Sequence, residues 1–245
     1  MILAAGLGTR LRPLTDHCPK AMVEVAGKPL LEHTIFRLRK AGFDRIVVNV
    51  HHFGQQIIDF LAAHEHFGMD IRISDERSLL LNTGGGIKHA LPLLQPDEPV
   101  LIHNVDIASD ICLSRLYEDA LREQGTSDAL LVVNSRPTSR YLLFNQSEHL
   151  RGWLNVKPDG NVGIAKGEEP METLSRLHFT GIHLMQPTLL EALAAYPEDA
   201  FSVIDFYLSV CTTHALHSYH TDHCQWVDCG RVESLPAAAE ILSKE

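Results

Sequence analysis

Apolar runs alternate with amphipathic segments along the first half of the chain. The run at 44–50 (DRIVVNV) predicts a buried strand, and 28–43 predicts a helix with Pro29 in its first turn and Gly42 at its end. The same patterns predict strands at 69–76, 98–106 and 127–134, and helices at 54–64 and 113–125. The glycine-rich start of 84–94 predicts a loop that enters a helix. Strands that alternate with helices predict an α/β fold with a parallel, doubly wound sheet.

The pattern changes from about Arg136 onward. Short extended runs at 140–145, 152–156 and 177–185, with a turn at 157–161 between the last two, predict an antiparallel extension of the sheet. The remaining chain predicts helices at 187–196 and 202–211, a strand pair within 214–230 and a final helix at 232–243. No linker interrupts the chain, so we expect one domain over 1–245, made of a core (1–134), the extension (about 135–186) and a C-terminal strand and helix (187–245).

Chain length, cysteine content, hydropathy and net charge limit the kinds of protein that this chain can be. A chain of 245 residues buries enough surface to fold without disulfides, and its five cysteines form no CxxC pair, so we expect free thiols in a reducing compartment. No segment reaches the roughly 20 apolar residues that span a bilayer, which favours a cytoplasmic protein without a membrane partner. The formal net charge of −10 argues against nucleic-acid binding but allows a small anionic ligand at a local cationic cluster. Monomer and homodimer both stay open.

The opening stretch, MILAAGLGTRLR, joins a short apolar strand to a glycine-rich, cationic turn. In an open α/β sheet, ligands bind beyond the carboxyl ends of the strands. Gly6 and Gly8 let backbone N–H groups approach an anion, and Arg10, Arg12 and Lys20 add positive charge. Leu11 breaks a GxGxxG fingerprint, and GxxxxGK[ST] is absent. Spacing alone leaves a phosphate-binding turn and an ordinary βα turn with surface arginines equally open.

Longer motifs extend this observation. The segments LAAGLGTRLRPLT and PKAMVEVAGKPLLEH resemble the opening signature of the sugar-1-phosphate nucleotidylyltransferases, and later motifs follow in the family's order. These are NTGGGIKHAL (82–91), HNVDI (103–107), FTGIHLM (179–185) and WVDCG (226–230). The chain looks most like bacterial N-acetylmuramate-1-phosphate uridylyltransferases of cell-wall nucleotide-sugar biosynthesis, and next like mannose-1-phosphate guanylyltransferases. The resemblance implies a Rossmann-like, mixed and mostly parallel sheet flanked by helices, of the nucleotide-diphospho-sugar transferase type.

The resemblance also implies a reaction and its residues. A sugar-1-phosphate oxygen attacks the α-phosphorus of an NTP, and pyrophosphate leaves. Arg10 is assigned to the β- and γ-phosphates, and Lys20 to the phosphates at the reacting centre, whereas Arg12 is expected to form a structural ion pair. Asp106 is the third catalytic residue and, with Asp228, is expected to hold Mg²⁺. The remaining nucleotide-binding positions are Ala4, Ala5, Gly6, Gly8, Thr9, Thr83, Gly84 and Gly85, with Gly86 beside them.

Other assignments concern the acceptor and departures from the family pattern. Asn104, Thr180 and Gly181 are expected on the sugar side, and Arg136, Arg140 and Arg151 either meet an acidic sugar or are surface residues. Val105 stands where the family usually has glycine, and it adds bulk near the nucleotide or sugar. This departure keeps open a catalytically silent nucleotide-sugar-binding regulator. Within the same class of enzyme, a GTP-dependent mannose- or heptose-1-phosphate guanylyltransferase is the alternative.

The chain also holds an unusual number of histidines, 15 in all, and those between 214 and 223 recur every third residue. This spacing suggests a zinc site. A strand there would send residues three apart to opposite faces, which argues against one.

Overall fold

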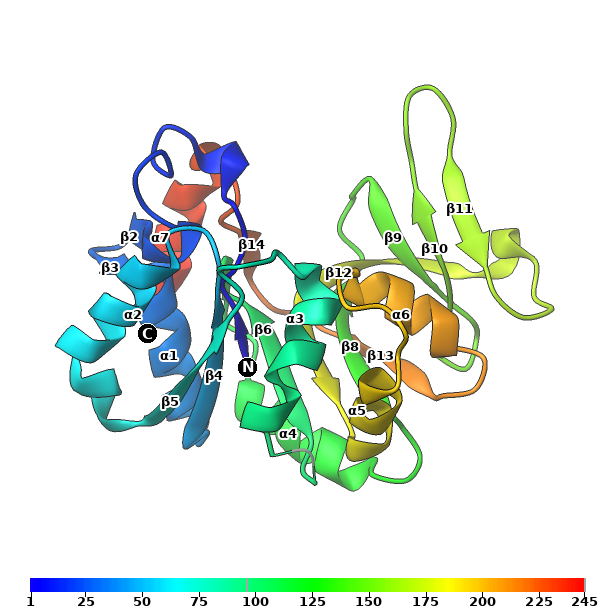
Figure 1. Ribbon diagram of the computed structural model, residues 1–245. Coiled ribbons are helices and arrows are strands. Elements are labelled where there is room, and N and C mark those ends of the chain that lie inside the picture. Colours follow the sequence, from blue (N-terminus) through cyan, green and yellow to red (C-terminus); the bar gives the residue numbers. More distant parts are fainter. Residues whose placement is uncertain (96, 245) are drawn as a thin grey trace.

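The chain forms a central sheet with helices on both faces (Figure 1). The structure is a computed structural model that describes residues 1–95 and 97–244. From one edge to the other, the sheet's strands are β11 (Val162–Ala165), β10 (Leu150–Asn155), β9 (Arg140–Phe144), β12 (Ser175–Met185), β6 (Val100–Asn104), β1 (Ile2–Leu3), β4 (Arg45–Val50) and β5 (Asp70–Asp75). Two further strands belong to it, because β8 (Ala129–Asn134) pairs with β12 and with β13 (Leu216–His220).

Strand direction divides the sheet. The pairs β6–β1, β1–β4 and β4–β5 are parallel, as the alternation of strand and helix predicts. β12 runs antiparallel to β6, β8 and β9, and the β9–β10–β11 hairpins continue antiparallel. The predicted α/β class and the antiparallel extension are therefore confirmed.

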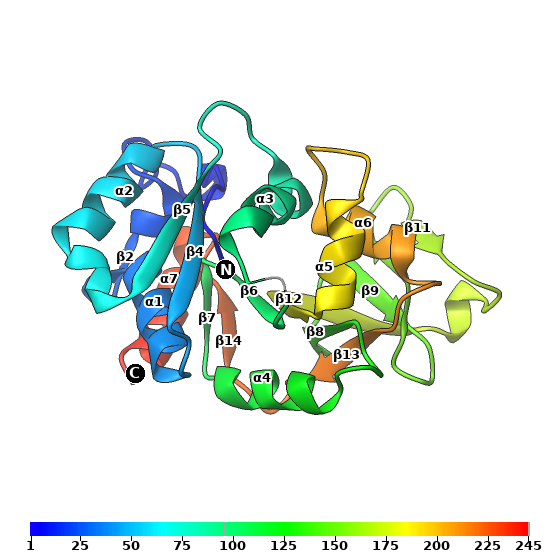
Figure 2. The ribbon, with the colours of Figure 1, turned by 60° about the horizontal axis from the view of Figure 1, so that its bottom comes forward.

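Alternating side chains bury both faces of the sheet. In β4, Ile46 and Val48 point to one hydrophobic cluster and Val47 to the other. The first cluster is covered by α1 (Leu30–Lys40), α2 (Gly54–Ala63), α4 (Leu113–Arg122) and α7 (Leu235–Leu242). The second is covered by α3 (Asn82–Ala90), α5 (Pro187–Ala194) and α6 (Val203–Val210), on the opposite side of the sheet in Figure 2.

Short elements complete the fold. Two small antiparallel ribbons pair β2 (Glu24–Val25) with β3 (Lys28–Pro29), and β7 (Ile107–Ser109) with β14 (Trp226–Asp228). The 3-10 helices are η1 (Thr9–Leu11), η2 (Lys20–Met22), η3 (Glu65–Gly68), η4 (Leu91–Leu93), η5 (Met171–Thr173) and η6 (Val232–Ser234). Within the described residues, no helix has the length and apolar character needed to cross a bilayer. All five cysteines are free thiols.

Two predictions about elements were wrong, and two short strands were missed. The expected strand pair within 214–230 does not form, because β13 pairs with β8 and β14 pairs with β7. The glycines at 84–86 are inside helix α3 rather than in a loop before it. The turn at 157–161 leads into β11, a strand that the sequence pattern missed along with β7. In the first two cases a partner distant in the sequence decides the local structure, whereas β11 pairs with its sequence neighbour β10 across that turn.

Candidate active site

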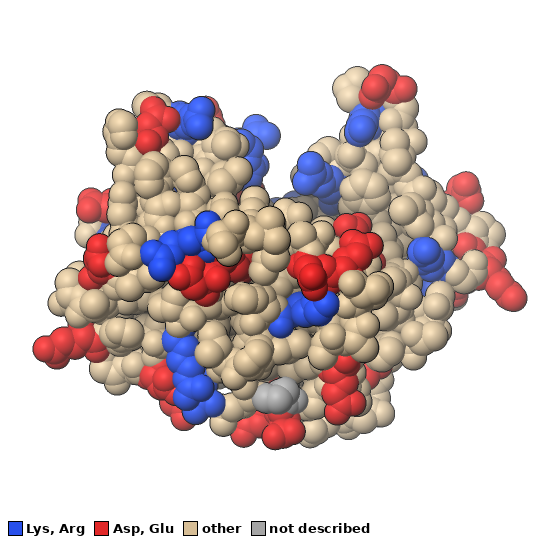
Figure 3. Space-filling view, in the orientation of Figure 1, with Lys and Arg blue, Asp and Glu red and all other residues tan. Residues whose placement is uncertain are grey.

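The candidate site lies where the direction of chain winding reverses. β1 has β4 on one side and β6 on the other, so the crevice beyond its carboxyl end is the expected ligand position. A cavity of about 730 Å³ lies there. Figure 3 shows the molecule hollowed at the top, with basic side chains on both sides. The cavity is lined by the opening loop, the ends of β4 and β6, the start of α3, Gly230 and the segment from Glu198 to Asp205.

The opening loop presents its backbone to this cavity. Its anchor is Ala4, whose buried N–H donates to Asn49 Oδ1 at 2.7 Å. Gly8 has a φ of 65°, and a Cβ there would lie 3.0 Å from the Thr15 side chain, so this turn requires glycine. Thr15 Oγ1 fixes the turn by donating to the Gly8 carbonyl at 2.8 Å. The predicted residues Ala5, Gly6, Gly8, Thr9 and Arg10 all line the cavity, while Ala4 lies just behind it.

Two carboxylates from distant parts of the chain meet beside the loop. Asp106 follows β6, and Asp228 ends β14, which pairs with β7. The Cys229 N–H donates to the Asp106 carbonyl at 2.8 Å, which fixes the two segments side by side. Burial raises the pKa of Asp106, the charge of Lys20 opposes that rise, and the neighbouring Asp228 carboxylate adds to it. The fold therefore brings the two predicted metal ligands together.

Each carboxylate has one of the predicted phosphate-binding cations as its partner. Lys20 Nζ donates to Asp106 Oδ2, and Arg10 Nη2 lies 3.6 Å from Asp228 Oδ2. Gly230 makes room for the second pair, because a Cβ there would lie 2.5 Å from Arg10 Nη2. Two cations and two carboxylates thus form one cluster at the edge of the cavity.

The donor set fits Mg²⁺ bound in part by substrate. Mg²⁺ prefers oxygen ligands and commonly takes one or two carboxylates, with phosphate oxygens and waters filling the other positions. Asp106 and Asp228 supply two carboxylates, and residues 1–95 and 97–244 contain no group of three or more His, Cys, Asp or Glu side chains that would bind an ion without substrate. The Lys20 ammonium already occupies a cation position on Asp106.

The predicted base-binding glycines have a different environment from the opening loop. The Gly84 and Gly85 N–H groups donate to the Phe201 carbonyl at 2.9 and 3.2 Å, and neither residue lines the cavity. A Cβ on Gly84 would lie 2.4 Å from the Phe201 ring, and one on Gly85 2.1 Å from the Asp199 carbonyl. Thr83 does line the cavity, and its Oγ1 accepts from the Val203 N–H at 2.9 Å. These glycines therefore let the segment before α6 pack against α3.

Sequence reasoning missed the wall that this packing creates. Glu198, Ala200, Phe201, Ser202 and Asp205 line the cavity. Ser202 caps α6 by accepting from the Ile204 N–H at 3.2 Å, and a serine before a helical pattern is a readable signal for that cap. Nothing local indicates that the segment reaches the site. Asn49 was also missed, although a polar residue at the carboxyl end of a predicted strand is a usable signal.

The predicted sugar-side residues are divided between the cavity and the sheet. Asn104 lines the cavity at the end of β6. Gly181 adjoins it with a φ of 82°, and a Cβ there would lie 2.6 Å from Asn104 Nδ2. Thr180 is 1% exposed and its hydroxyl donates to the Val132 carbonyl, so its side chain is part of the sheet.

A model of the nucleotidyl transferase family matches residues 1–245. The chain belongs to this family. It is 40% identical over 209 residues to the N-acetylmuramate alpha-1-phosphate uridylyltransferase of Caulobacter vibrioides, covering 83% of this chain and 80% of the relative. The protein of the same name from Neisseria meningitidis is 36% identical over 80% of this chain and 78% of its own length. The family is one of transferases, so the chain is an enzyme of that class.

A solved structure supports the same fold for this nucleotidyl transferase. HddC from Yersinia pseudotuberculosis, crystallised with GMP-PN, superposes with a TM-score of 0.74 at 24% identity, covering 98% of this chain and 96% of that one. This likeness extends over the antiparallel part of the sheet as well as the parallel part.

Four further arginines that the sequence singled out have different surroundings. Arg12 pairs with Asp16 at 3.5 Å, as expected for a structural ion pair. Arg136 lies over the Trp226 ring and donates to the Trp226 carbonyl. Arg151 donates to the Cys211 carbonyl at 2.8 Å and pairs with Glu169. Arg140 is exposed at the start of β9. None of the four lines the cavity within the described part of the chain.

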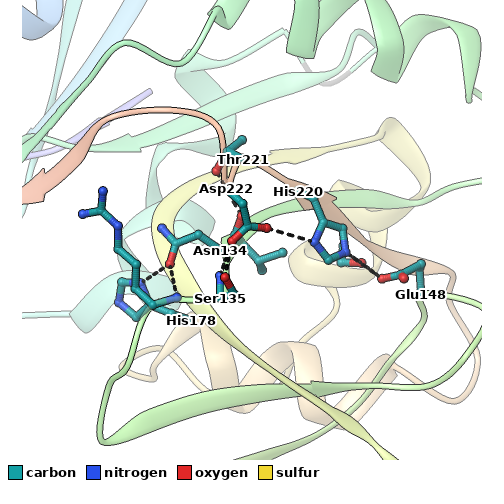
Figure 4. A network of polar contacts seen from close by, with 10 residues as sticks. Asn134, Ser135, Glu148, His178, His220, Thr221 and Asp222 are labelled. Atoms are coloured by element: carbon teal, nitrogen blue, oxygen red, sulfur yellow. Dashed lines mark hydrogen bonds and ion pairs between the residues drawn. The ribbon is translucent and has the colours of Figure 1, made fainter.

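The histidine-rich segment forms polar contacts instead of a metal site. His220 lies between Glu148 and Asp222, with N–O distances of 3.0 and 3.6 Å, and Asp222 accepts from the Ser135 N–H at 2.6 Å (Figure 4). The neighbouring His217 contacts His149 with 2.9 Å between their Nε2 atoms. No zinc-like cluster of three ligands occurs in the part of the chain that the structure describes. These contacts link the end of β13 to the loops that follow β8 and β9.

Proposed function

We propose that this nucleotidyl transferase joins an NTP to a sugar 1-phosphate, giving a nucleotide sugar and pyrophosphate, within one domain. The observation that carries the proposal is the cluster of Arg10, Lys20, Asp106 and Asp228 beside one cavity at the carboxyl end of β1. Two anions must meet in this reaction, so catalysis rests on positioning and on neutralising charge.

The chain's own residues divide the work. Backbone N–H groups of the opening loop approach the nucleotide phosphates, and Arg10 pairs with the β- and γ-phosphates and then with the departing pyrophosphate. Lys20 lies nearer the α-phosphate, where it neutralises charge as the sugar-phosphate oxygen attacks. Asn104 and the wall from Glu198 to Asp205 border the space left for the acceptor.

Asp106 and Asp228 would hold Mg²⁺. When bound, the ion would supply neutralisation of the charge on the phosphates. The two carboxylates fix its position relative to the opening loop.

The substrates that we propose are UTP and an N-acetylmuramate-type sugar 1-phosphate, in the cytoplasm and in supply of cell-wall synthesis. Support comes from the two uridylyltransferase relatives at 40% and 36% identity. The alternative is GTP with mannose or heptose 1-phosphate, since the Aspergillus oryzae mannose-1-phosphate guanyltransferase is 28% identical over 94% of this chain.

Pyrophosphate release with four NTPs against several sugar 1-phosphates tests the reaction. We expect turnover with UTP and N-acetylmuramate 1-phosphate, and a fall in kcat of about 10²-fold or more in Asp228→Asn because charge neutralisation is lost. Asp59→Asn, which removes an exposed carboxylate on α2, should retain wild-type turnover. Preference for GTP would establish the alternative, and nucleotide-sugar binding without turnover would establish a regulator.

A further inference from the structure

The candidate metal carboxylates are not free in the ligand-free protein. Lys20 Nζ contacts Asp106 Oδ2, and both side chains are largely buried, at 13% and 12% exposed. The more open pair, Arg10 and Asp228, has side chains 54% and 38% exposed. The groups assigned to the phosphates therefore neutralise the groups assigned to the metal.

A divalent ion entering alone would have to displace Lys20 from Asp106. A buried charge without a partner is unfavourable, and Lys20 would then face a doubly charged cation. In the described part of the chain, Asp106 is the one side chain that accepts from Lys20 Nζ. A triphosphate removes this obstacle, because its oxygens accept from Lys20 and Arg10 while the carboxylates turn to the metal.

We propose that Lys20 and Arg10 are internal counter-ions that keep the metal site closed until nucleotide arrives. This proposal rests on the proposed function. Metal and triphosphate then bind interdependently, since each takes a partner that the other releases. The Arg10 position is built into the fold, because Gly230 leaves space that a Cβ would fill.

The first test measures Mn²⁺ binding to nucleotide-free protein by electron paramagnetic resonance. We expect weak binding to the wild type and at least about tenfold tighter binding to Lys20→Met, which keeps the side-chain length but removes the charge. Lys20→Arg should stay close to the wild type. Arg45→Met, which breaks an ion pair with Asp70 away from the cavity, is the matched control. Equal or weaker Mn²⁺ binding by Lys20→Met would overturn the proposal.

The second test measures UTP binding by calorimetry with excess chelator. Asp106→Asn should bind metal-free UTP at least about tenfold more tightly than the wild type, because Lys20 is released. Asp205→Asn removes a negative charge from the same cavity but breaks no ion pair in the described structure, so its gain should stay under about threefold. Equal gains in both variants would reduce the effect to general charge and overturn the proposal.

Turnover measured in parallel separates the two proposals. If the wild type releases pyrophosphate but the variants show no such binding shifts, the counter-ion proposal is overturned and the proposed reaction stands. If the binding shifts occur but no substrate pair is turned over, the proposed reaction is overturned and the counter-ion proposal stands. Thermal unfolding checks each variant, and the Asp106→Asn measurement decides the matter if Lys20→Met does not fold.

Discussion

At the scale of the residue, Val105 has the clearest structural role. The sequence singles it out as bulk near the nucleotide, where the family usually has glycine. It borders the cavity but is 3% exposed and packs in the hydrophobic cluster beneath the site. Its N–H donates to the Leu3 carbonyl at 3.1 Å, which holds the end of β6 beside β1. The side chain supports the site from below.

Replacing this valine should therefore cost stability. We expect Val105→Gly to lower the free energy of unfolding by about 2–4 kcal/mol, from lost packing and added backbone freedom, without raising kcat. Urea denaturation and pyrophosphate release measure the two quantities. Val156→Gly, at a valine that is 39% exposed, should cost much less. A faster enzyme of unchanged stability would instead mean that Val105 obstructs the site.

Much of the residue-level site was readable from the sequence. The family motifs single out Arg10, Lys20 and Asp106, and these motifs follow strands whose carboxyl ends share one edge of the sheet. The pairing of Lys20 with Asp106 was not readable, because it depends on how two distant segments fold over each other.

At the scale of the element, helix α3 depends on a segment more than a hundred residues away. Three consecutive glycines favour a loop by local propensity. They form a helix here because the chain from Asp199 to Val203 packs against them and accepts or donates several hydrogen bonds. Lys88 strengthens the contact by donating to the carbonyls of Tyr196 and Glu198 at 2.7 and 3.0 Å. Local propensity is why the sequence predicted a loop, and tertiary packing is why a helix forms instead.

A glycine-to-alanine change in α3 should lower stability, although the same change inside a helix usually raises it. Replacing glycine by alanine in a helix interior normally stabilises the helix by about 1 kcal/mol. We expect Gly85→Ala to destabilise by about 1–3 kcal/mol, because the added methyl group meets the Asp199 carbonyl. The acceptor KM should rise as the cavity wall shifts. Lys88→Met, which loosens the same contact without a clash, should raise that KM with a smaller loss of stability. A gain in stability for Gly85→Ala would contradict this packing.

At the scale of the whole molecule, the sheet places two neutral histidines in its centre. His103 on β6 and His183 on β12 are on adjacent strands and are almost completely buried. Burial lowers the pKa of each to about 3. The alternation that defines the fold class was readable from the sequence, but not which of the 15 histidines lie inside, because a strand pattern does not tell a buried polar residue from an exposed one.

These histidines should make the protein sensitive to acid. A folded pKa below the unfolded value of about 6.5 contributes stability above that pH, and the contribution is lost as pH falls toward 3. Between pH 7 and 5, each histidine should cost about 2 kcal/mol of unfolding free energy. Denaturant titrations across this range measure the slope. His183→Gln should reduce the loss of unfolding free energy between pH 7 and 5 by about 2 kcal/mol, and exposed His52→Gln is the control variant. An unchanged slope in His183→Gln would place the proton uptake elsewhere.

Strand β12 belongs to both parts of the sheet. Its last four residues pair with β6, and its first three pair with β9, so one continuous strand joins the parallel part of the sheet to the antiparallel extension. A hinge between the two parts would have to break that hydrogen-bond ladder. We therefore expect substrate entry and product release to require movement of the loops that line the cavity, while the sheet keeps its conformation.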